Sequence, residues 1–278
     1  MNHENITARE ILAHLTIKNR GEWAKTRADI QTRAQIPPED VVKSIEGSRG
    51  FVTILDSDGY PQSLTAIPQP PFVLFFEGDV DVLKTPSDRI LSVAGDSSAS
   101  DYGLDCAERM GKACAERGIV LCSKVARGCG STALRACAKA GGKCIGVMSG
   151  GIDRPYPNRK DTEDTVADIL ASGGVVISEY PDGTDPQATA FALSSRVVAA
   201  LCKALYVPQM KKTGGTAMTV AFALNGGKDV GAAPFEAGNP DVANNELIGA
   251  GALLVDDAEE FLDAEYGFGD GENHDHLS

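Results

Sequence analysis

From residue 89 onward, short apolar runs rich in β-branched residues recur between segments with helical spacing. Such runs predict strands that are buried on both faces, and strands that alternate with helices predict right-handed crossovers and a parallel sheet. We therefore expect an α/β fold: an extended Rossmann-like, doubly wound, mostly parallel sheet. Its strands are predicted at residues 90–94, 119–122, 144–148, 174–178, 204–207, 229–233 and 252–255.

The first 50 residues show a different pattern, with apolar positions at helical spacing that predict two or three short helices. One of these is expected to begin at Pro37–Pro38, because proline is tolerated in the first turn of a helix. Further along, Phe72–Phe76 is a strongly β-prone run and predicts a strand that enters the main sheet. We divide the chain into a small helical N-terminal domain (1–50), an extended Rossmann domain (51–262) and an acidic, disordered tail (263–278).

The 278 residues carry a formal net charge of -13. This argues at first against a nucleic-acid partner, because such binding depends on Lys and Arg. Residues 256–278, however, hold nine acidic residues and no basic ones, which leaves 39 - 9 = 30 acidic against 26 basic residues in the rest. That balance permits a local basic patch. We interpret the acidic end as a solvated tail. The alternative is that this segment competes with a ligand for a basic groove of the same chain.

The seven cysteines lie inside predicted elements and tight loops, without a C-x-x-C pair or a nearby histidine, so we expect small buried thiols. The four histidines (His3, His14, His274 and His276) lie outside the α/β region, which argues against a histidine general base and a typical zinc site. The polar N-terminus and the lack of a long apolar run predict a cytoplasmic protein that does not contact membranes. We expect no catalytic residue, cofactor or metal.

Two glycine-rich loops follow predicted strands and open predicted helices. Gly128–Ala133 fits the G-x-G-x-x-G/A dinucleotide fingerprint, and Lys124 and Arg127 flank it. Lys211–Ala217 holds two lysines before its glycines, but its spacing is not that of a Walker A loop, so ATP hydrolysis is not indicated. Backbone N–H groups at such helix N-termini bind phosphate, and the alternative for each loop is a turn that only packs. We predict anion binding at both loops.

Three more residues are singled out by their positions. Arg196 is expected to head a helix over 197–201, where a cation is unfavourable unless an anion lies nearby, so we predict a ligand contact. Glu179 follows a predicted strand and is the one obvious carboxylate in the crevice, with acid–base chemistry or a structural hydrogen bond as its possible roles. The single tryptophan, Trp23, is predicted to be a packing anchor rather than a platform for base stacking.

Several motifs occur in an order that resembles one known family. They are Tyr60-Pro61-x-x-Leu64, Pro70–Asp79, Ser100-x-Tyr102-Gly103, Gly151-Ile152-Asp153 with Tyr156-Pro157-Asn158, Gly173–Pro181 and Asn245–Ala252. From about residue 59 to 255 the chain resembles the DNA-processing protein A (DprA/Smf) family, within the superfamily that also holds the cytokinin-activating LOG enzymes. The resemblance implies a homodimer that binds single-stranded DNA without catalysis and helps to load a RecA-type recombinase during transformation.

The chain also departs from the family pattern. The family's Gly-Ser-Arg is Gly95-Asp96-Ser97 here, its Ser-Gly-x-Ala-x-Gly-Ile-Asp is Ser123–Gly130, and its Arg-Asn-Arg aligns with Ser194-Ser195-Arg196. Each lost charged contact is worth about 1–3 kcal/mol of affinity. The predicted DNA-binding or phosphate-binding residues are Gly95, Ser97, Ser123, Lys124, Arg127, Gly128, Gly130, Arg196, Lys211, Lys212, Gly214, Gly215 and Thr216.

Three functions are open at this point. The leading one is a DprA-like, single-stranded-DNA-binding protein that assists recombination or DNA uptake. The second is a Rossmann module that senses a nucleotide and has lost DNA binding, which the loss of cations at Ser97 and Ser194 and the acidic end favour. The third is a LOG-like nucleoside monophosphate hydrolase, although Thr213–Ala217 retains only a fragment of the Pro-Gly-Gly-x-Gly-Thr-x-x-Glu motif and lacks its glutamate.

Overall fold

A computed structural model describes residues 6–32, 35–156, 159–236 and 242–267. Within these residues nine strands form one sheet in the order β1-β2-β6-β5-β4-β3-β7-β8-β9. β2 pairs antiparallel with β1 and β6, and the other neighbouring pairs are parallel, which confirms the predicted fold class. The strands are β1 (Gly50–Thr53), β2 (Val73–Gly78), β3 (Ile90–Val93), β4 (Val120–Lys124), β5 (Cys144–Val147), β6 (Val175–Ser178), β7 (Ala204–Val207), β8 (Asp229–Ala232) and β9 (Leu253–Leu254).

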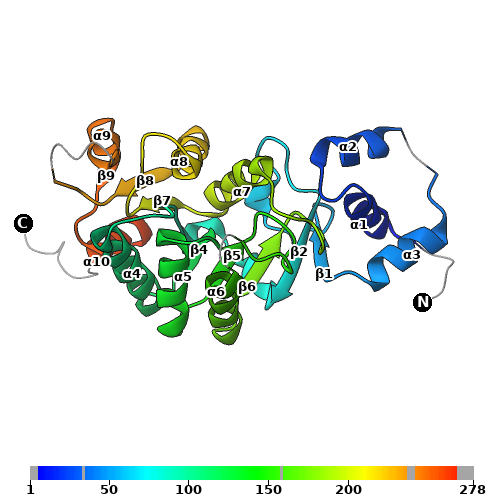
Figure 1. The fold of residues 1–278 in the computed structure, drawn as a ribbon, viewed down its shortest axis with the longest axis horizontal. Helices are drawn as coiled ribbons and strands as arrows, with labels where there is room; N and C mark the ends of the chain where they lie inside the picture. Colours follow the sequence, from blue (N-terminus) through cyan, green and yellow to red (C-terminus); the bar gives the residue numbers. More distant parts are fainter. Residues whose placement is uncertain (1–5, 33–34, 157–158, 237–241, 268–278) are drawn as a thin grey trace, which may run out of the picture.

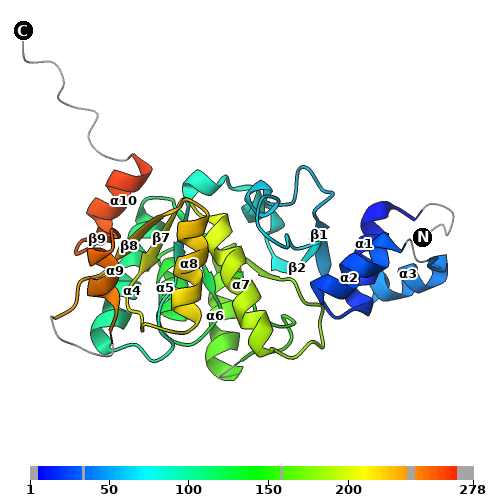
Figure 2. The same ribbon diagram turned by 90° about the horizontal axis from the view of Figure 1, so that it is seen from above.

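Helices cover both faces of this sheet, as Figures 1 and 2 show. α4, α5, α6 and α10 pack on one face, and α7 and α8 lie side by side on the other. Three short 3-10 helices (Gln62–Leu64, Val80–Lys84 and Ser87–Arg89) lie in the connections on either side of β2 and before β3. The α-helices are α1 (Ala8–Lys18), α2 (Trp23–Gln31), α3 (Pro38–Glu46), α4 (Asp101–Glu116), α5 (Cys129–Lys139), α6 (Arg159–Ala171), α7 (Ala188–Leu201), α8 (Gly215–Asn225), α9 (Asn244–Gly249) and α10 (Ala258–Tyr266).

The central strands are apolar on both sides because helices cover both faces. All four residues of β3 are buried, and two adjacent residues of this strand, Ile90 and Leu91, belong to different core clusters. Ile90 packs with residues of α7, whereas Leu91 packs with residues of α4 and α5. This alternation follows from the two-residue period of a strand. It explains why the predicted strands read as unbroken apolar runs, and each predicted run coincides with an observed strand.

The N-terminal helices α1, α2 and α3 cluster beside β1 and β2, at the end of the molecule opposite β9 (Figure 1). Their number agrees with the prediction, and α3 begins at Pro38. The Trp23 ring stacks on the Phe72 ring with 5.3 Å between centroids, and the indole N–H donates to the Pro70 carbonyl at 2.8 Å. Trp23 is therefore a packing anchor, as predicted. β1 was not predicted from the sequence.

The C-terminal end differs from the prediction. The tail was expected to begin at residue 263, but α10 continues to Tyr266. Arg117 donates to Asp263 at 2.7 Å, and the Tyr266 hydroxyl donates to the Ile90 carbonyl at 2.8 Å, so tertiary contacts hold the last turn of the helix. The boundary at 263 is therefore wrong, and residues 268–278 lie outside the described part of the chain.

Two other features of the fold bear on the sequence-based expectations. All seven cysteines are free and buried, which confirms their predicted role as small core residues. Among the helices of the described ranges, none is both long and apolar enough to cross a bilayer.

Candidate functional site

A pocket of about 400 Å³ lies at the carboxyl ends of the central strands, where the strand order reverses between β3 and β7. Ligands of doubly wound folds bind at this kind of switch point. The loops after β3 and β4 and the first turns of α5 and α8 form most of the pocket. Its lining residues are Val93, Ala94, Gly95, Asp96, Ser97, Ser123, Lys124, Ala126, Arg127, Gly130, Tyr156, Phe191, Val198, Gly215, Thr216 and Thr219.

Lys124, the last residue of β4, places its ammonium group within this pocket. Its Nζ donates to the Phe191 carbonyl at 2.8 Å and to the Ser195 hydroxyl at 2.6 Å. An ammonium group has three N–H donors, so one is left for a ligand. Burial lowers the pKa of Lys124 to about 8, because the charged form loses solvation and no carboxylate bonds to it. A bound anion would restore the missing interaction.

Two helix N-termini also face the pocket. α5 is preceded by Gly128 (φ 91°) and α8 by Gly214 (φ 118°), and neither helix has a side-chain cap. In the first turn of α5 the Cys129 and Ser131 N–H groups donate to the Asp96 and Ala126 carbonyls, which leaves the Gly130 N–H without a backbone acceptor among the described residues. In α8 the N–H groups of Gly215 and Thr216 have none, and such N–H groups can bind an anion. Gly130 and Gly215 bring these turns into the lining. Gly128 is required by its neighbourhood as well as its φ, because a Cβ there would lie 2.1 Å from the Asp96 carbonyl oxygen.

Asp96 opposes this positive potential from within the pocket. Its Oδ2 is buried without a hydrogen bond, and the Lys211 ammonium lies 3.9 Å from it. Burial raises the pKa of Asp96, while the Lys211 charge acts in the opposite direction. The carboxylate replaces a small neutral side chain of the family pattern, so it is a specific obstacle to phosphate binding in this chain.

The structure brings eight of the thirteen predicted phosphate-binding residues into the pocket wall: Gly95, Ser97, Ser123, Lys124, Arg127, Gly130, Gly215 and Thr216. The Ser123 hydroxyl donates to the Val93 carbonyl at 2.7 Å, so it braces β4 against β3. Arg127 lines the pocket with an exposed side chain, which makes no hydrogen bond or ion pair with another described residue. Gly128 and Gly214 precede the two helices as described.

Lys211 lies beside the pocket, 3.9 Å from Asp96, but the other two predicted cations lie elsewhere. Arg196 does not head a helix, because α7 already begins at Ala188, and that prediction is wrong. Its guanidinium is buried and donates to both Glu179 carboxylate oxygens, at 2.7 and 2.6 Å, and to the Gln69 carbonyl. Glu179 is thus a structural partner and not a pocket carboxylate. Lys212 turns away to Glu246 at 2.7 Å.

Two aromatic residues of the pocket were missed. Tyr156 and Phe191 contribute to its wall, with 5.4 Å between ring centroids. Tyr156 belongs to a motif quoted for the family resemblance, but the sequence alone does not show that the β5–α6 loop meets Phe191 in the first turn of α7. Aromatic rings beside cationic groups are typical of single-stranded nucleic-acid sites, because every base has a π-face to stack on a ring.

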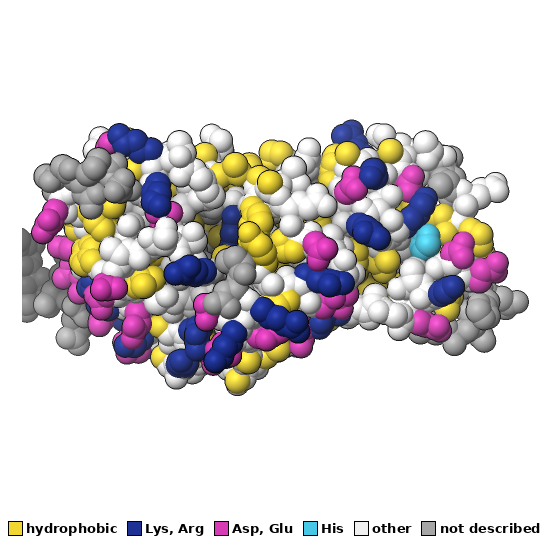
Figure 3. All heavy atoms as spheres, viewed as in Figure 1, with side chains coloured by type: hydrophobic (Ala, Val, Ile, Leu, Met, Phe, Trp, Pro, Cys, Tyr) yellow, Lys and Arg dark blue, Asp and Glu magenta, His cyan; other side chains and the backbone are white. Residues whose placement is uncertain are grey.

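The face of the molecule shown in Figure 3 carries many Lys and Arg side chains over α5 and α6 and over the N-terminal helices, with Asp and Glu side chains between them. The negative net charge of the whole chain therefore does not describe this face. Many of these cations are paired, as with Arg135, which donates to Asp168 at 2.8 Å. The unpaired positive groups of the pocket stand out against this background.

Comparison with known proteins identifies the family. Residues 51–265 match the model of DNA recombination-mediator protein A. The chain is 33% identical to DNA processing protein DprA of Streptococcus pneumoniae over 218 residues, covering 78% of this chain and 74% of that protein. It is 32% identical to protein Smf of Escherichia coli over 209 residues, covering 75% of this chain and about half (54%) of the relative.

The fold comparison agrees with the sequence match. The structure of the Streptococcus pneumoniae protein superposes with a TM-score of 0.69 at 26% identity, and the match covers 93% of each chain. DNA processing protein A of Helicobacter pylori shares the fold, with a TM-score of 0.68 at 22% identity over 78% of this chain and 95% of that one. The chain therefore belongs to the DNA recombination-mediator protein A family, which includes the DprA and Smf proteins.

Proposed function

We propose that this chain binds single-stranded DNA in the pocket between β3 and β7 and acts without catalysis in recombination or DNA uptake. The observation that carries the proposal is the Lys124 ammonium, which keeps one free donor beside the uncapped N-termini of α5 and α8. Three positive groups that converge without a bonded carboxylate form a receptor for a phosphate. The related protein of Helicobacter pylori binds single-stranded DNA.

The same geometry argues for binding rather than catalysis. Among the described lining residues the one carboxylate is Asp96, and no histidine contributes to the wall. Glu179, which would be the other candidate acid or base, is buried in its pair with Arg196. Phosphate contacts through backbone N–H groups and a lysine fix a strand in place but carry no base code. We therefore expect binding that depends little on sequence.

Fluorescence anisotropy with labelled oligo-dT tests this proposal. Binding should be tightest at low salt and weaken steeply between about 50 and 200 mM salt, because phosphate contacts release counterions. Lys124→Met should lower the affinity about 10- to 150-fold, the equivalent of one charged hydrogen bond. Lys139→Met is the matched control, since Lys139 lies in the last turn of α5, away from the pocket. Absence of salt-sensitive binding at micromolar protein would refute the proposal.

We propose further that the protein forms a homodimer through the β9 edge of the sheet. Leu253 and Leu254 are exposed on this edge strand, and Met218 and Leu224 of the neighbouring α8 are exposed too. An unpaired edge strand with apolar side chains is a template for pairing with a second copy. Light scattering after size exclusion should give twice the chain mass for the native protein and a monomer for Leu254→Arg, and a native monomer would contradict the dimer.

The family assignment also supports a RecA-type recombinase as partner, a cytoplasmic location and a separate helical domain over residues 1–50. A pull-down of purified recombinase with the native protein, in the presence and absence of oligo-dT, tests the partner. Retention of the recombinase supports it, and equal recovery on empty resin counts against it.

Asp96 favours one second candidate, a sensor of a single nucleotide. A pocket of about 400 Å³ is of the size that small ligands occupy. A carboxylate in the wall penalises a strand with many phosphates more than a nucleotide that presents its base or sugar to this side. A thermal-shift screen of nucleotides separates the candidates, because a ligand of the native state raises the melting temperature by mass action. A flat screen would exclude the sensor.

A further inference from the structure

A second, smaller pocket lies where the N-terminal helices meet the α/β body. It has a volume of about 170 Å³, and it lies between the turn that joins α1 to α2 and the loop that leads from β6 into α7. The first of these segments contributes Arg20 and Trp23, and the second contributes Thr184, Gln187 and Thr189. We call this cavity the junction pocket.

The junction pocket brings two positive groups together. The exposed Arg20 side chain makes no hydrogen bond or ion pair with any other described residue. The N-terminus of α7 is also uncapped: Gln187 precedes it without a side-chain bond, and within the described residues the N–H groups of Ala188 and Thr189 have no backbone acceptor. A helix N-terminus carries about half a positive charge, so an anion between it and Arg20 would be stabilised by both.

Two carboxylates, Glu22 and Asp185, line the junction pocket themselves, and both are already engaged. Glu22 accepts from Lys25 at 2.7 Å, and Asp185 lies 3.8 Å from the Arg154 guanidinium. The Asp185 side chain is also largely exposed, so water screens its charge. The local balance therefore leaves Arg20 as the cation without a counter-charge among the described groups around the cavity.

A buried hydroxyl gives independent support for a ligand. Thr184 lines the junction pocket, is only 8% exposed, and its Oγ1 has no hydrogen-bond partner. A buried hydroxyl without a partner is unfavourable by more than a typical hydrogen bond contributes, so such groups are rare in native proteins. The Oγ1 atom itself has almost no solvent-accessible surface, so it would donate to a phosphate oxygen in the cavity after a rotation of the Thr184 side chain.

The junction pocket and the main pocket are both lined by residues from the first turns of α7. Phe191 lines the main pocket, while Thr189, Ala190 and Leu193 line the junction pocket. The two cavities therefore flank the N-terminal end of one helix, about 10–12 Å across with its side chains. A single strand that leaves the main pocket over Phe191 needs only a few nucleotides to pass this helix.

We propose that the junction pocket binds a second phosphate of the same DNA strand, so that the N-terminal helices form part of the nucleic-acid interface. This inference rests on the proposed function and extends it by giving the strand a direction, from the central strands across the start of α7 toward Arg20. The lining also includes Glu22 and Asp185, but each of these carboxylates is paired with a lysine or arginine, so a phosphodiester would meet the Arg20 guanidinium and the free N–H groups of α7.

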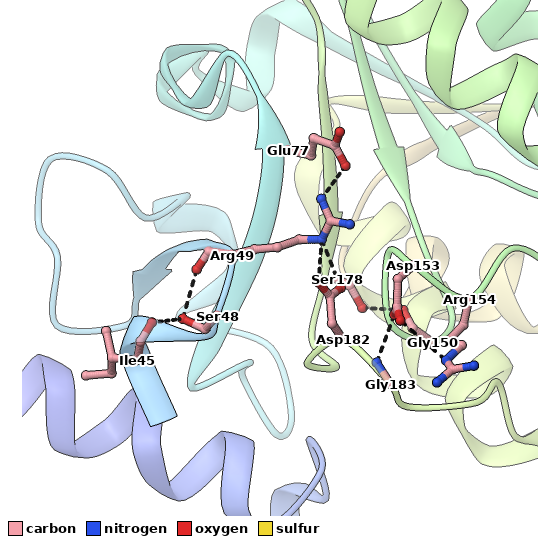
Figure 4. A network of polar contacts seen from close by, with 10 residues as sticks. All are labelled: Ile45, Ser48, Arg49, Glu77, Gly150, Asp153, Arg154, Ser178, Asp182 and Gly183. Carbon is pink, nitrogen blue, oxygen red and sulfur yellow. Dashed lines mark hydrogen bonds and ion pairs between the residues drawn. The ribbon is translucent and has the colours of Figure 1, made fainter. Parts of the chain in front are cut away.

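Figure 4 shows a network of polar contacts that joins the segment after α3 to the β6–α7 loop, which contributes to the junction pocket. Arg49, just after the N-terminal helices, pairs with Glu77 of β2 and with Asp182 of the β6–α7 loop. The β6–α7 loop is also bonded to the β5–α6 loop, because the Gly183 N–H donates to Asp153 at 2.8 Å. Gly21 packs so closely on Tyr180 that a Cβ there would lie 2.7 Å from the ring. The two walls are thus fixed before any ligand arrives.

A length series of oligo-dT tests the inference, with Trp23 as the reporter. Trp23 is the single tryptophan of the chain and lines the junction pocket. An oligomer of about 16 nucleotides should change its emission, whereas one of about 4 nucleotides should fill the main pocket and leave it unchanged. Arg20→Gln should weaken binding of the long oligomer about tenfold and leave the short one unaffected. Arg20→Lys should restore most of the affinity.

The control variant is Lys43→Gln, which removes the same charge from α3 outside the pocket. The inference would be overturned if Arg20→Gln and Lys43→Gln bound the long oligomer equally well and the Trp23 emission did not change. Binding of the short oligomer in the same experiment would still support the main pocket. Loss of binding at every length in the native protein would overturn the proposed function together with the inference. Inorganic phosphate that changes Trp23 emission as strongly as the long oligomer would show a site for free phosphate and contradict a strand contact.

Discussion

The affinity for single-stranded DNA should fall as the pH rises from 7 to 9, because Lys124 loses its charge in this range. An ordinary lysine titrates near about 10.4, but burial lowers the pKa of Lys124 to about 8 in the free protein. A phosphate bound at its free donor would favour the charged form and return the pKa toward its ordinary value. DNA binding would then require proton uptake above pH 8.

The size of the effect follows from these two pKa values. At pH 7 nearly all of the free protein carries a charged Lys124, and at pH 9 about one molecule in ten does. If the bound form stays protonated, the apparent affinity falls about tenfold between these two pH values. The free energy of unfolding of the free protein should change in the opposite direction. Between about pH 8 and 10 Lys124 is protonated in the unfolded chain but mostly neutral in the folded one, so the stability rises with pH there.

Anisotropy titrations at constant ionic strength measure this dependence. Oligo-dA is the probe of choice, because thymine itself begins to lose a proton near the upper end of the range. Lys124→Arg is the control, since a guanidinium stays charged throughout and should bind with little pH dependence. A tenfold decrease that persists in Lys124→Arg, or a flat profile in the native protein, would refute the role given to this lysine.

Three further predictions follow from single contacts. Asp96→Asn should raise the affinity for oligo-dT about fivefold, because it removes a negative charge from the wall of the pocket, as anisotropy would show. Gly128→Ala should destabilise the protein by about 1–3 kcal/mol in urea unfolding and weaken DNA binding, because its Cβ would lie 2.1 Å from the Asp96 carbonyl oxygen. Glu179→Gln should lower the free energy of unfolding by about 3–5 kcal/mol, because it leaves the buried Arg196 without its counter-charge, and a variant as stable as the native protein would disprove this.

The sequence predicted the frame of the site because that frame depends on local patterns. Apolar runs located the parallel strands, and the glycines before Cys129 and Gly215 located the starts of α5 and α8. Since parallel strands end at one edge, the loops after β3 and β4 had to meet there. Lys124 and Arg127 were found for this reason, as residues adjacent to a glycine turn.

The remaining errors concern contacts between distant segments. Arg196 was assigned to a helix start because the apolar run begins after it, but the two turns before it also belong to α7. Its ion-pair partner Glu179 directly follows β6, in a different element of the fold. No spacing in the chain encodes that pair. Tyr156 and Phe191 meet only because the β5–α6 loop folds over the start of α7. The extent of α10 likewise depends on Arg117, far away in the sequence.

The most direct test of the central claim is an amide NMR titration of the protein with a short oligo-dT. The account predicts that the largest chemical-shift changes occur at the backbone N–H groups of Gly130, Gly215 and Thr216, where α5 and α8 begin. If the oligomer binds and these three amides do not shift, the pocket between β3 and β7 is not the phosphate site, and the account is contradicted.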